Sequence, residues 1–448
     1  MSDELFEGDR IDVTVGEPAH GGHCVARIGG PHGQVVFVRH ALPGERVTAV
    51  VTELHKGYLR ADAVEIHEAS PDRVAAPCAF AHPGGCGGCD LQHVAPAAQL
   101  AWKSAVVRSL LGRMGGLSSE RIAELDIRVE PLPGGPLGWR SRVRYAVDAA
   151  GRPGLLQHRS HEVVPIDRCL IAHPELQKLD VTGRLWPDAA AVEVVASTGG
   201  DISVRPRPAT TALLAPAEPV APGALVPGGN GLPGEPAEAP ADGPAEVTEL
   251  AVGRKWQVPP DGFWQVHPAA ADTLVGAVLE LLQPAEGESS WDLYGGAGLF
   301  AAALAERTRG RVTVIESAPV GVTAARTNLA DLNGVEVVAG RVDVALGRRR
   351  VTGPVDLVVL DPPRTGAGTK VVRAITTARP RAVAYVACDP AALSRDVQTF
   401  AAEGYKLAAL KAYDCFPMTQ HIECVALLVP GYQPPAEQVV SSNDAAGQ

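Results

Sequence analysis

Short hydrophobic runs separated by turns open the chain. Between residues 9 and 67 the segments IDVTV, QVVFV and RVTAVV alternate with the turn-prone segments GEPAHGG, GGPHG and ALPGE. This spacing is typical of a small closed β-barrel. Apolar residues then recur at helical spacing among basic ones, which predicts one amphipathic helix over residues 94–115. More strand-like segments follow as far as about residue 204.

A regular alternation of helical and strand patterns begins after Pro268. Helical segments separate the strands SSWDLY, RVTVIE, VEVVA, VDLVVLD and AVAYVA, and two further strands are predicted near 406–413 and 422–429. Such alternation implies βαβ units and a mostly parallel sheet. Because ligands bind at the carboxyl ends of the strands in such sheets, attention falls on four places. They are residues 294–298, Glu316, Asp361 and Cys388.

Two segments lack the composition of a packed core. Residues 205–246 contain 10 Pro and 6 Gly, a share above the roughly 25–30% that marks low complexity. Apolar side chains are too few there to offset the entropy of ordering, so we predict a disordered insertion. The polar tail, residues 433–448, is predicted to be disordered as well.

Composition and charge set the broad class. With 448 residues, 46% hydrophobic and 20% charged, the chain is long and apolar enough for two or three domains. We expect a soluble cytoplasmic protein with no membrane association, because the sequence shows neither a long apolar span nor an export signal. The net charge of −11 argues against a wholly basic nucleic-acid surface but leaves room for a local basic patch.

A glycine turn follows the first strand of the alternating region. In DLYGGAGLF, Gly295, Gly296 and Gly298 allow positive φ angles and the close approach of a ligand. Glu316 ends the next strand, where a carboxylate accepts hydrogen bonds from both ribose hydroxyls in dinucleotide folds. The alternative interpretation of Glu316 is an ordinary helix-capping acid. Together they suggest a nucleoside-bearing cofactor. The lack of a P-loop lysine favours S-adenosylmethionine over ATP.

Reactive groups follow two later strands. DPPRTGAG places Asp361 at a strand end beside a rigid Pro-Pro pair. VACDP places Cys388 before a helix N-terminus, whose field is expected to lower the thiol pKa, although a buried structural thiol is the commoner fate of a single Cys. Glu423 in HIE is a candidate general base, or else an edge-strand charge.

Four other cysteines form a candidate metal site. In a reducing cytosol a disulfide framework is improbable. Cys78, Cys86 and Cys89 lie on a Gly-rich loop with C-x7-C-x2-C spacing, and Cys169 in IDRCLI is the best fourth ligand. Four thiolates suit an iron–sulfur cluster or structural zinc. The absence of two paired C-x-x-C knuckles favours the cluster.

A basic stretch precedes the low-complexity segment. WRSRVRYAV places Arg140, Arg142 and Arg144 beside Trp139 and Tyr145. If the arginines share one strand face, they can bind phosphates and stack on unpaired bases. The alternative is a solvated strand face.

These motifs resemble one family over nearly the whole chain apart from the insertion and the tail. GGHCVARIGG, VVFVRHALPGE and SPDRV resemble a TRAM domain, CGGCDLQH a cluster loop, and FWQVH, DLYGGAGLF, DPPRTG, ACDP and HIE the catalytic signatures. The chain thus resembles the S-adenosylmethionine-dependent RNA 5-methyluridine methyltransferases with a TRAM domain and an iron–sulfur cluster. This resemblance implies an α/β protein in three parts. They are a TRAM/OB-like β-barrel (1–67), a central α+β iron–sulfur RNA-binding domain (68–262) and a Rossmann-like class I methyltransferase domain (263–432).

The resemblance also implies roles for individual residues. Cys388 would be the nucleophile and Glu423 the base that removes the C5 proton. The cofactor-binding positions would be Gln265, Tyr294, Gly296, Gly298, Leu299, Glu316, Asp343 and Asp361, and a 4Fe-4S cluster would be bound by Cys78, Cys86, Cys89 and Cys169. Three features depart from the family pattern: the longer first cysteine spacing, Tyr294-Gly295 in place of Phe-Cys, and Asp343 in place of Asn. None removes a reacting group.

The implied activity is methylation of C5 of a uridine in structured RNA, by a protein expected to be a monomer. We favour 23S ribosomal RNA because the resembling branch with both TRAM domain and cluster acts there, and the T-loop of tRNA is the alternative. A non-catalytic RNA-binding protein or chaperone would have no need of both Cys388 and Glu423. A radical S-adenosylmethionine enzyme would need a C-x3-C-x2-C loop, and the sequence contains none.

Overall fold

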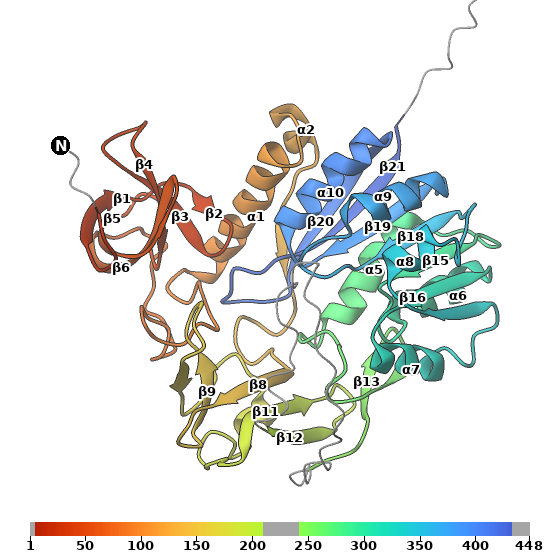
Figure 1. Ribbon diagram of the computed structural model, residues 1–448, viewed down its shortest axis with the longest axis horizontal. Coiled ribbons are helices and arrows are strands. Elements are labelled where there is room, and N and C mark those ends of the chain that lie inside the picture. The colour runs from red at the N-terminus through yellow and green to blue at the C-terminus, as the bar shows by residue number, and fades with distance from the viewer. Residues whose placement is uncertain (1–4, 209–241, 432–448) are drawn as a thin grey trace, which may run out of the picture.

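The computed structural model describes residues 5–208 and 242–431. They form three lobes, an N-terminal barrel, a central domain and a large α/β domain (Figure 1). The β-barrel and the α/β domain that the sequence predicts are present among the described elements.

The N-terminal lobe is a curled antiparallel sheet, apart from one parallel pair. Its strand order is β1-β5-β6-β4-β3-β2, and β1 also packs against β3, which curls the sheet into a barrel. Alternate residues such as Ile11 and Val13 point into its core. The strands are β1 (Arg10–Thr14), β2 (Pro18–Ala19), β3 (His23–Ile28), β4 (Gln34–Arg39), β5 (Arg46–His55) and β6 (Tyr58–Glu68).

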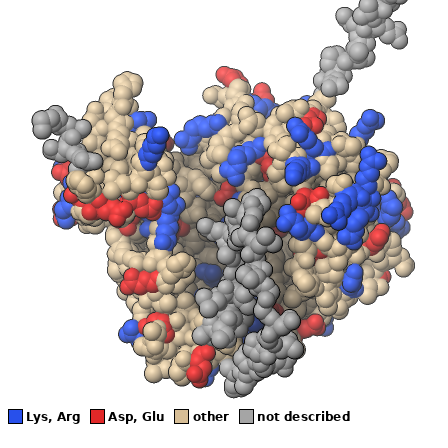
Figure 2. Space-filling model, viewed as in Figure 1, with Lys and Arg blue, Asp and Glu red and all other residues tan. Residues whose placement is uncertain are grey.

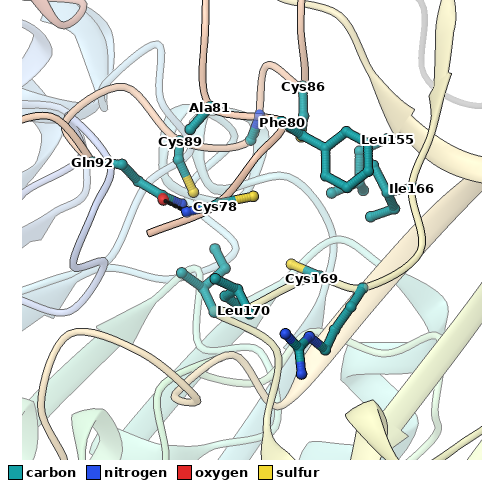
Figure 3. Close-up of a pocket in the computed structure, with 13 residues that line it drawn as sticks. Cys78, Phe80, Ala81, Cys86, Cys89, Gln92, Leu155, Ile166, Cys169 and Leu170 are labelled. Atoms are coloured by element: carbon teal, nitrogen blue, oxygen red, sulfur yellow. Dashed lines mark hydrogen bonds between the residues drawn. The ribbon is translucent and has the colours of Figure 1, made fainter. Parts of the chain in front are cut away.

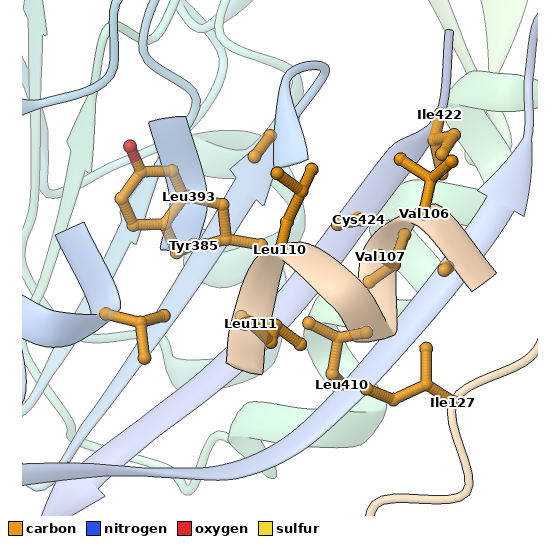
Figure 4. Close-up of a cluster of buried hydrophobic side chains, with 14 of the residues drawn as sticks. Val106, Val107, Leu110, Leu111, Ile127, Tyr385, Leu393, Leu410, Ile422 and Cys424 are labelled. Atoms are coloured by element: carbon orange, nitrogen blue, oxygen red, sulfur yellow. The ribbon is translucent and has the colours of Figure 1, made fainter. Parts of the chain in front are cut away.

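A helix and a short strand then join the barrel to the α/β domain. The predicted helix is confirmed as α1 (Pro96–Arg113), which starts with Pro at its first position and is followed by α2 (Ser119–Glu124) and β7 (Val129–Pro131). Figure 4 shows Val107, Leu110 and Leu111 of α1 against side chains of the α/β sheet. Truncating one such leucine to alanine typically costs about 2–5 kcal/mol. These residues therefore add a layer to the α/β domain, which the predicted boundary at residue 68 did not anticipate.

The central domain is built on a five-stranded sheet in the order β10-β9-β8-β11-β12 and a separate hairpin, β13-β14. Trp139, Val143 and Tyr145 belong to its core. Its elements are β8 (Arg142–Val147), β9 (Pro153–Leu156), β10 (Val163–Pro165), α3 (Pro174–Gln177), β11 (Ala189–Ala196), β12 (Ile202–Pro208), β13 (Val247–Ala251) and β14 (Arg254–Val258).

The edges of the predicted insertion are ordered, which corrects its boundaries. Residues 205–208 are the end of β12, where they pair with β11, and Asp242 forms a β-bridge with Val204. Pairing with an existing strand supplies backbone hydrogen bonds that the Pro-rich composition alone does not reveal. Residues 209–241 and the predicted tail from 433 lie outside the described residues.

The α/β domain contains an eight-stranded sheet in the order β17-β16-β15-β18-β19-β21-β20-β7. The first five strands are parallel, and β21 runs antiparallel to both neighbours. The strands are β15 (Ser290–Leu293), β16 (Val312–Glu316), β17 (Val335–Ala339), β18 (Leu357–Leu360), β19 (Ala382–Ala387), β20 (Tyr405–Asp414) and β21 (Glu423–Pro430).

Helices cover both faces of this sheet, as expected for buried parallel strands rich in Val and Leu. One apolar cluster contains α1, α8 (Val342–Gly347), α9 (Gly368–Thr377) and α10 (Pro390–Ala402). The other contains α5 (Ala270–Leu282), α6 (Leu299–Thr308) and α7 (Pro319–Asn328). The strand order reverses between β15 and β18, so a ligand crevice is expected at their carboxyl ends. Within the described segments, no helix is both long and apolar enough to span a membrane.

Candidate active site and four-cysteine site

Cys388 and Glu423 meet at one end of the α/β sheet. Cys388 directly follows β19, and Glu423 is the first residue of β21. The two strands are antiparallel, with Ala387 opposite Cys424, so the end of one strand lies beside the start of the other. The structure thus brings together two side chains that are 35 positions apart in the sequence.

The environment of Cys388 opposes its ionisation. Burial, followed by the neighbouring carboxyl groups of Glu423 and Asp361, raises the thiol pKa to about 12, although the Arg364 guanidinium favours the thiolate. The expectation of a lowered pKa is therefore wrong for this structure. Asp389 caps α10 by accepting from Ala392 N at 2.8 Å, so its carboxylate, rather than the thiol, interacts with the helix N-terminus.

Glu423 and Asp361 form a buried carboxyl pair. Burial and then the charge of Asp361 raise the pKa of Glu423 well above its usual value. Desolvation raises the pKa of Asp361 to about 7. Two interacting carboxyl groups of this kind titrate as a pair, so one can hold a proton while the other is ionised.

The glycine turn lies at the carboxyl end of β15. Tyr294, Gly296 and Gly298 have positive φ angles of 63°, 52° and 94°. A side chain at Gly298 would place its Cβ 2.6 Å from Leu329 Cδ1, so the close packing of turn and helix requires glycine. Leu299 is the first residue of α6 and is buried.

Glu316 is tied directly to this turn. Its Oε2 accepts from Gly296 N at 3.0 Å and its Oε1 from Ala318 N at 2.6 Å. Each carboxylate oxygen retains a second lone pair, so the group is still able to accept from the hydroxyls of a ribose.

Asp292 is a site residue that sequence reasoning missed. It is fully buried on β15, and its Oδ2 accepts from Ala301 N at 2.8 Å while Oδ1 has no partner among the described residues. Burial raises its pKa to about 7, and the charges of Asp361 and Glu316 contribute. The acidic first residue of DLYGGAG was the available signal.

The remaining predicted cofactor residues are placed less directly. Asp343 pairs with Arg341 at 3.0 Å, which lowers the pKa of Asp343. Burial and then the charge of Asp343 raise the pKa of Tyr294 to about 12, so these two side chains are neighbours. Gln265 is buried between β14 and α5, but no hydrogen bond in the described segments joins its side chain to the glycine turn.

A second network holds the loop that follows Asp361. Asp396 on α10 accepts from Ala367 N at 2.7 Å and from the Tyr385 hydroxyl at 2.7 Å. A Cβ at Gly366 would lie 2.7 Å from Asp396 Oδ2, so the glycine allows this approach. No sequence signal marked these residues, because α10 meets the loop only in the folded chain.

All four predicted cluster cysteines line one small, largely apolar cavity. Figure 3 shows the sulfur atoms of Cys78, Cys89 and Cys169 turned toward its middle. All four are free thiols, and Gly88 N donates to Cys86 Sγ at 3.3 Å. Burial raises the pKa of Cys86 to about 11, and the charges of Cys169 and Cys78 contribute. Among the residues described, no group of three or more His, Cys, Asp or Glu side chains is arranged to hold a metal ion.

The three arginines of WRSRVRYAV do not form a common exposed face. Arg142 is largely buried and pairs with Glu249 at 2.7 Å. Arg140 Nε donates to the Arg142 carbonyl at 3.2 Å. Arg144 is half exposed. The proposed RNA-binding face is therefore wrong for Arg142, which joins two segments of the central domain.

Charge is spread unevenly over the molecule. Figure 2 shows acidic side chains along the lower edge of the barrel and basic side chains gathered over the α/β domain, on a face hollowed between them. The overall charge of −11 therefore does not describe each region.

The fold is shared with a solved structure. The Pyrococcus abyssi tRNA (uracil-54, C5)-methyltransferase in complex with S-adenosyl-L-homocysteine superposes with a TM-score of 0.64 at 21% identity, covering 94% of this chain and 100% of that one. Together with the strand order, this likeness shows that the chain has the fold of that methyltransferase.

Sequence comparison narrows the class. Residues 4–64 match the TRAM domain and residues 352–430 match the tRNA (Uracil-5-)-methyltransferase family. A Streptomyces avermitilis protein named an uncharacterized RNA methyltransferase is 49% identical over 94% of this chain and 99% of its own length. A similarly named Corynebacterium glutamicum protein is 34% identical over 95% of this chain and 98% of its own length. The chain belongs to the TRAM-containing RNA (uracil-5-)-methyltransferase family.

Proposed function

We propose that this protein transfers the methyl group of S-adenosylmethionine to C5 of a uridine in structured RNA. The observation that carries the proposal is the meeting of Cys388 and Glu423 at the ends of two antiparallel strands. A thiol beside a carboxyl group with a raised pKa provides a nucleophile and a base in one pocket.

Each group has a defined step. The Cys388 sulfur bonds to C6 of the uracil, which makes C5 nucleophilic enough to take the methyl group from the sulfonium. Glu423 then removes the C5 proton, the sulfur–C6 bond breaks and the thiolate leaves. The target base must first leave its stack, at a cost of a few kcal/mol.

The proton balance uses the carboxyl pair. Because the Cys388 thiol is protonated at neutral pH, its proton must move to the Glu423–Asp361 pair before the sulfur adds. The pair then passes this proton to solvent, which leaves a carboxylate free to take the C5 proton after methyl transfer. The C5 proton returns to Cys388 as the thiolate leaves, so one proton has left to solvent, which matches the single proton that the reaction releases.

The methyl donor would bind at the carboxyl ends of β15 and β16. The glycine turn permits close approach of the donor, and Glu316 lies beside Gly296 with free lone pairs. With these two features we propose the predicted set of binding residues: Gln265, Tyr294, Gly296, Gly298, Leu299, Glu316, Asp343 and Asp361.

The four-cysteine site would hold a 4Fe-4S cluster. Four free thiols around one cavity fit a cluster that takes one thiolate per iron. Cys78, Cys86, Cys89 and Cys169 would bind it and supply a rigid connection between the cysteine loop and the central domain. Anaerobic purification should yield about four irons and four sulfides per chain, whereas zinc alone would contradict this assignment.

Two RNA substrates are candidates. We favour 23S ribosomal RNA, on the resemblance to the branch that has both a TRAM domain and a cluster. A tRNA is the second candidate, favoured by the family description of residues 352–430 and by the activity named for the Pyrococcus abyssi enzyme. We also expect a cytoplasmic monomer.

Transfer of labelled methyl from S-adenosylmethionine to unmodified 23S ribosomal RNA and to tRNA transcripts tests the proposal directly. Label in 5-methyluridine, mapped by mass spectrometry, identifies both the reaction and the substrate. Glu423→Gln should trap a covalent protein–RNA adduct on a denaturing gel, because the C5 proton then stays in place. Label at any atom other than C5 would refute the mechanism.

A further inference from the structure

A polar cavity of about 260 Å³ lies where the barrel meets the central domain. Strands of the barrel, the cysteine loop and the turn after β9 form its walls. Cys388 and Glu423 do not line it, so it is separate from the active site. Its basic and imidazole side chains are Arg39, Arg60, Arg159, His23, His82 and His158.

Several polar atoms in these walls have no partner. Nε of Arg39, Nε of Arg60, and Nε2 of His23 and of His158 are buried and make no hydrogen bond to any described residue. Arg39 is only 7% exposed and His23 only 3%. Since buried polar atoms in folded proteins are almost always hydrogen-bonded, the two unpaired guanidinium N–H groups indicate a ligand that accepts hydrogen bonds.

The nearby carboxylates do not satisfy Arg39. Asp62 and Asp90 each lie 3.8 Å from its guanidinium group, which is beyond hydrogen-bond distance. Burial raises the pKa of Asp62 despite the attraction of Arg39. Glu53 pairs instead with Arg60 at 2.8 Å. The cavity therefore retains a buried guanidinium group that forms ion pairs but no hydrogen bond with a carboxylate.

The two histidines add polar atoms rather than charge. Burial and then the Arg39 charge lower the pKa of His23 to about 3 and that of His158 to about 4, so both rings are neutral at pH 7. The two rings meet edge to face with centroids 6.4 Å apart, one on the barrel and one on the central domain. A ligand that touches both rings would therefore contact both domains.

We propose that this cavity binds a phosphate group, and that in the working enzyme the group is a phosphodiester of the RNA substrate. Guanidinium groups are well suited to phosphate oxygens. The cavity is also close to the catalytic loop, because Asp90, beside Arg39, accepts from Gln420 N at 3.1 Å, three residues before Glu423. A backbone phosphate held here would position the strand that carries the target base. The RNA assignment rests on the proposed function, whereas the phosphate site does not.

Two binding measurements on the full-length protein test the inference, neither of which needs the methyl donor. The first titrates inorganic phosphate at constant ionic strength and follows the ring NMR signals of His23 and His158. The second measures the affinity of a fluorescein-labelled oligouridine across a range of salt concentrations. Phosphate should shift both ring signals, and oligouridine should displace it.

Variants identify the cavity as the site. Arg39→Gln removes the charge but leaves a shorter polar side chain. It should weaken oligouridine binding about tenfold and reduce the slope of log affinity against log salt by about 0.7, the value for one phosphate contact on a single strand. His158→Ala, in a partly exposed turn, should weaken binding several-fold without unfolding the protein. Arg46→Gln removes a barrel arginine paired with Glu68 outside the cavity and should leave both quantities unchanged.

Each remaining outcome overturns the inference in a distinct way. Phosphate binding that oligouridine does not displace would assign a small-anion site and refute the RNA phosphodiester. Unshifted ring signals, or an Arg39→Gln variant that folds and binds like Arg46→Gln, would refute the phosphate site itself. If the unmodified protein bound phosphate and RNA but transferred no methyl group, only the proposed function would be refuted.

Discussion

Two sites in this protein hold half-buried thiols with raised pKa values, yet their neighbours differ. Cys388 has a thiol pKa of about 12 and faces carboxyl groups, with one guanidinium group nearby. Cys86 has a thiol pKa of about 11 and faces other thiols. Desolvation, the main cause in both cases, therefore does not distinguish the proposed nucleophile from the proposed metal ligand.

The difference lies in where each proton can go. At the Cys388 site, two coupled carboxyl groups can receive a proton and return it, which suits a thiol that must ionise only while it reacts. At the four-cysteine site, the neighbours of each thiol are other thiols in a largely apolar cavity. Binding a metal centre there would displace the thiol protons, and the thiolates would stay deprotonated while the metal is bound.

The largest effect should come from removing the nucleophile. Cys388→Ala is expected to lower the rate of methyl transfer by about 10⁴-fold or more, because no other group can bond to C6. Cys24→Ala removes a buried barrel thiol that donates weakly to the Ala41 carbonyl and should leave the rate unchanged. Initial rates of methyl transfer at saturating methyl donor compare the two variants. An active Cys388→Ala enzyme would refute the proposed nucleophilic mechanism.

The next effect concerns the four-cysteine site. Cys169→Ser should lose most of its iron and sulfide. Its free energy of unfolding should fall by a few kcal/mol, because the bound centre contributes folding free energy. Iron analysis and urea unfolding of the anaerobic protein measure both. Cys415→Ala, another buried thiol, should keep its iron. Full iron retention in Cys169→Ser would show that the comparison between the two sites is mistaken.

The sequence predicted the elements of these sites well where the pattern is local. The strand ends that carry Glu316, Asp361 and Cys388 fall where the alternation of apolar segments placed them. The convergence of Cys169 with the cysteine loop was also anticipated. In each case a motif and its position along a strand were sufficient.

Features that depend on distant contacts were not predictable. The raised pKa of Cys388 arises from Glu423 and Asp361, which reach it only when three strands align. Arg142 is basic in the sequence but is neutralised by Glu249, 107 residues later. Local pattern identifies the reacting groups, whereas their ionisation depends on the whole fold.

A smaller effect tests the electrostatics of the nucleophile. Arg364 favours the Cys388 thiolate, so Arg364→Gln should raise the thiol pKa further. Below that pKa the thiolate fraction then falls, and kcat/KM should decrease about two- to fivefold at neutral pH, since Arg364 is exposed and its charge is screened. Because the assay pH lies far below a thiol pKa of about 12, this deficit should stay constant with pH and should shrink at high salt, which screens the charge.

The pH profile of kcat/KM, measured at low and high salt, checks this expectation. Arg373→Gln removes an exposed arginine of α9 that pairs with Glu403, and its profile should match that of the unmodified enzyme. A loss in Arg364→Gln that high salt does not reduce would mean that Arg364 acts by contact with the substrate instead of through the thiol.

The smallest effect tests whether the nucleophile site is confined to the α/β domain. His20 of the barrel lies 3.3 Å from Asp389, the cap of α10 next to Cys388. Burial alone would raise the pKa of Asp389, but the hydrogen bond from His20 helps to lower it. A carboxyl group whose pKa is lowered by folding stabilises the protein above its unfolded-state pKa, and this contribution is lost as pH falls through the folded value.

His20→Ala should therefore reduce kcat/KM by about two- to fivefold and stability by less than about 1 kcal/mol at neutral pH, the range for a partly exposed ion pair. The stability difference should disappear in acid, where Asp389 is protonated in both proteins. His67→Ala removes a second barrel histidine, 3.9 Å from Asp12, and serves as the matched control. If both variants lost activity equally, the barrel would act through RNA binding and not through Asp389.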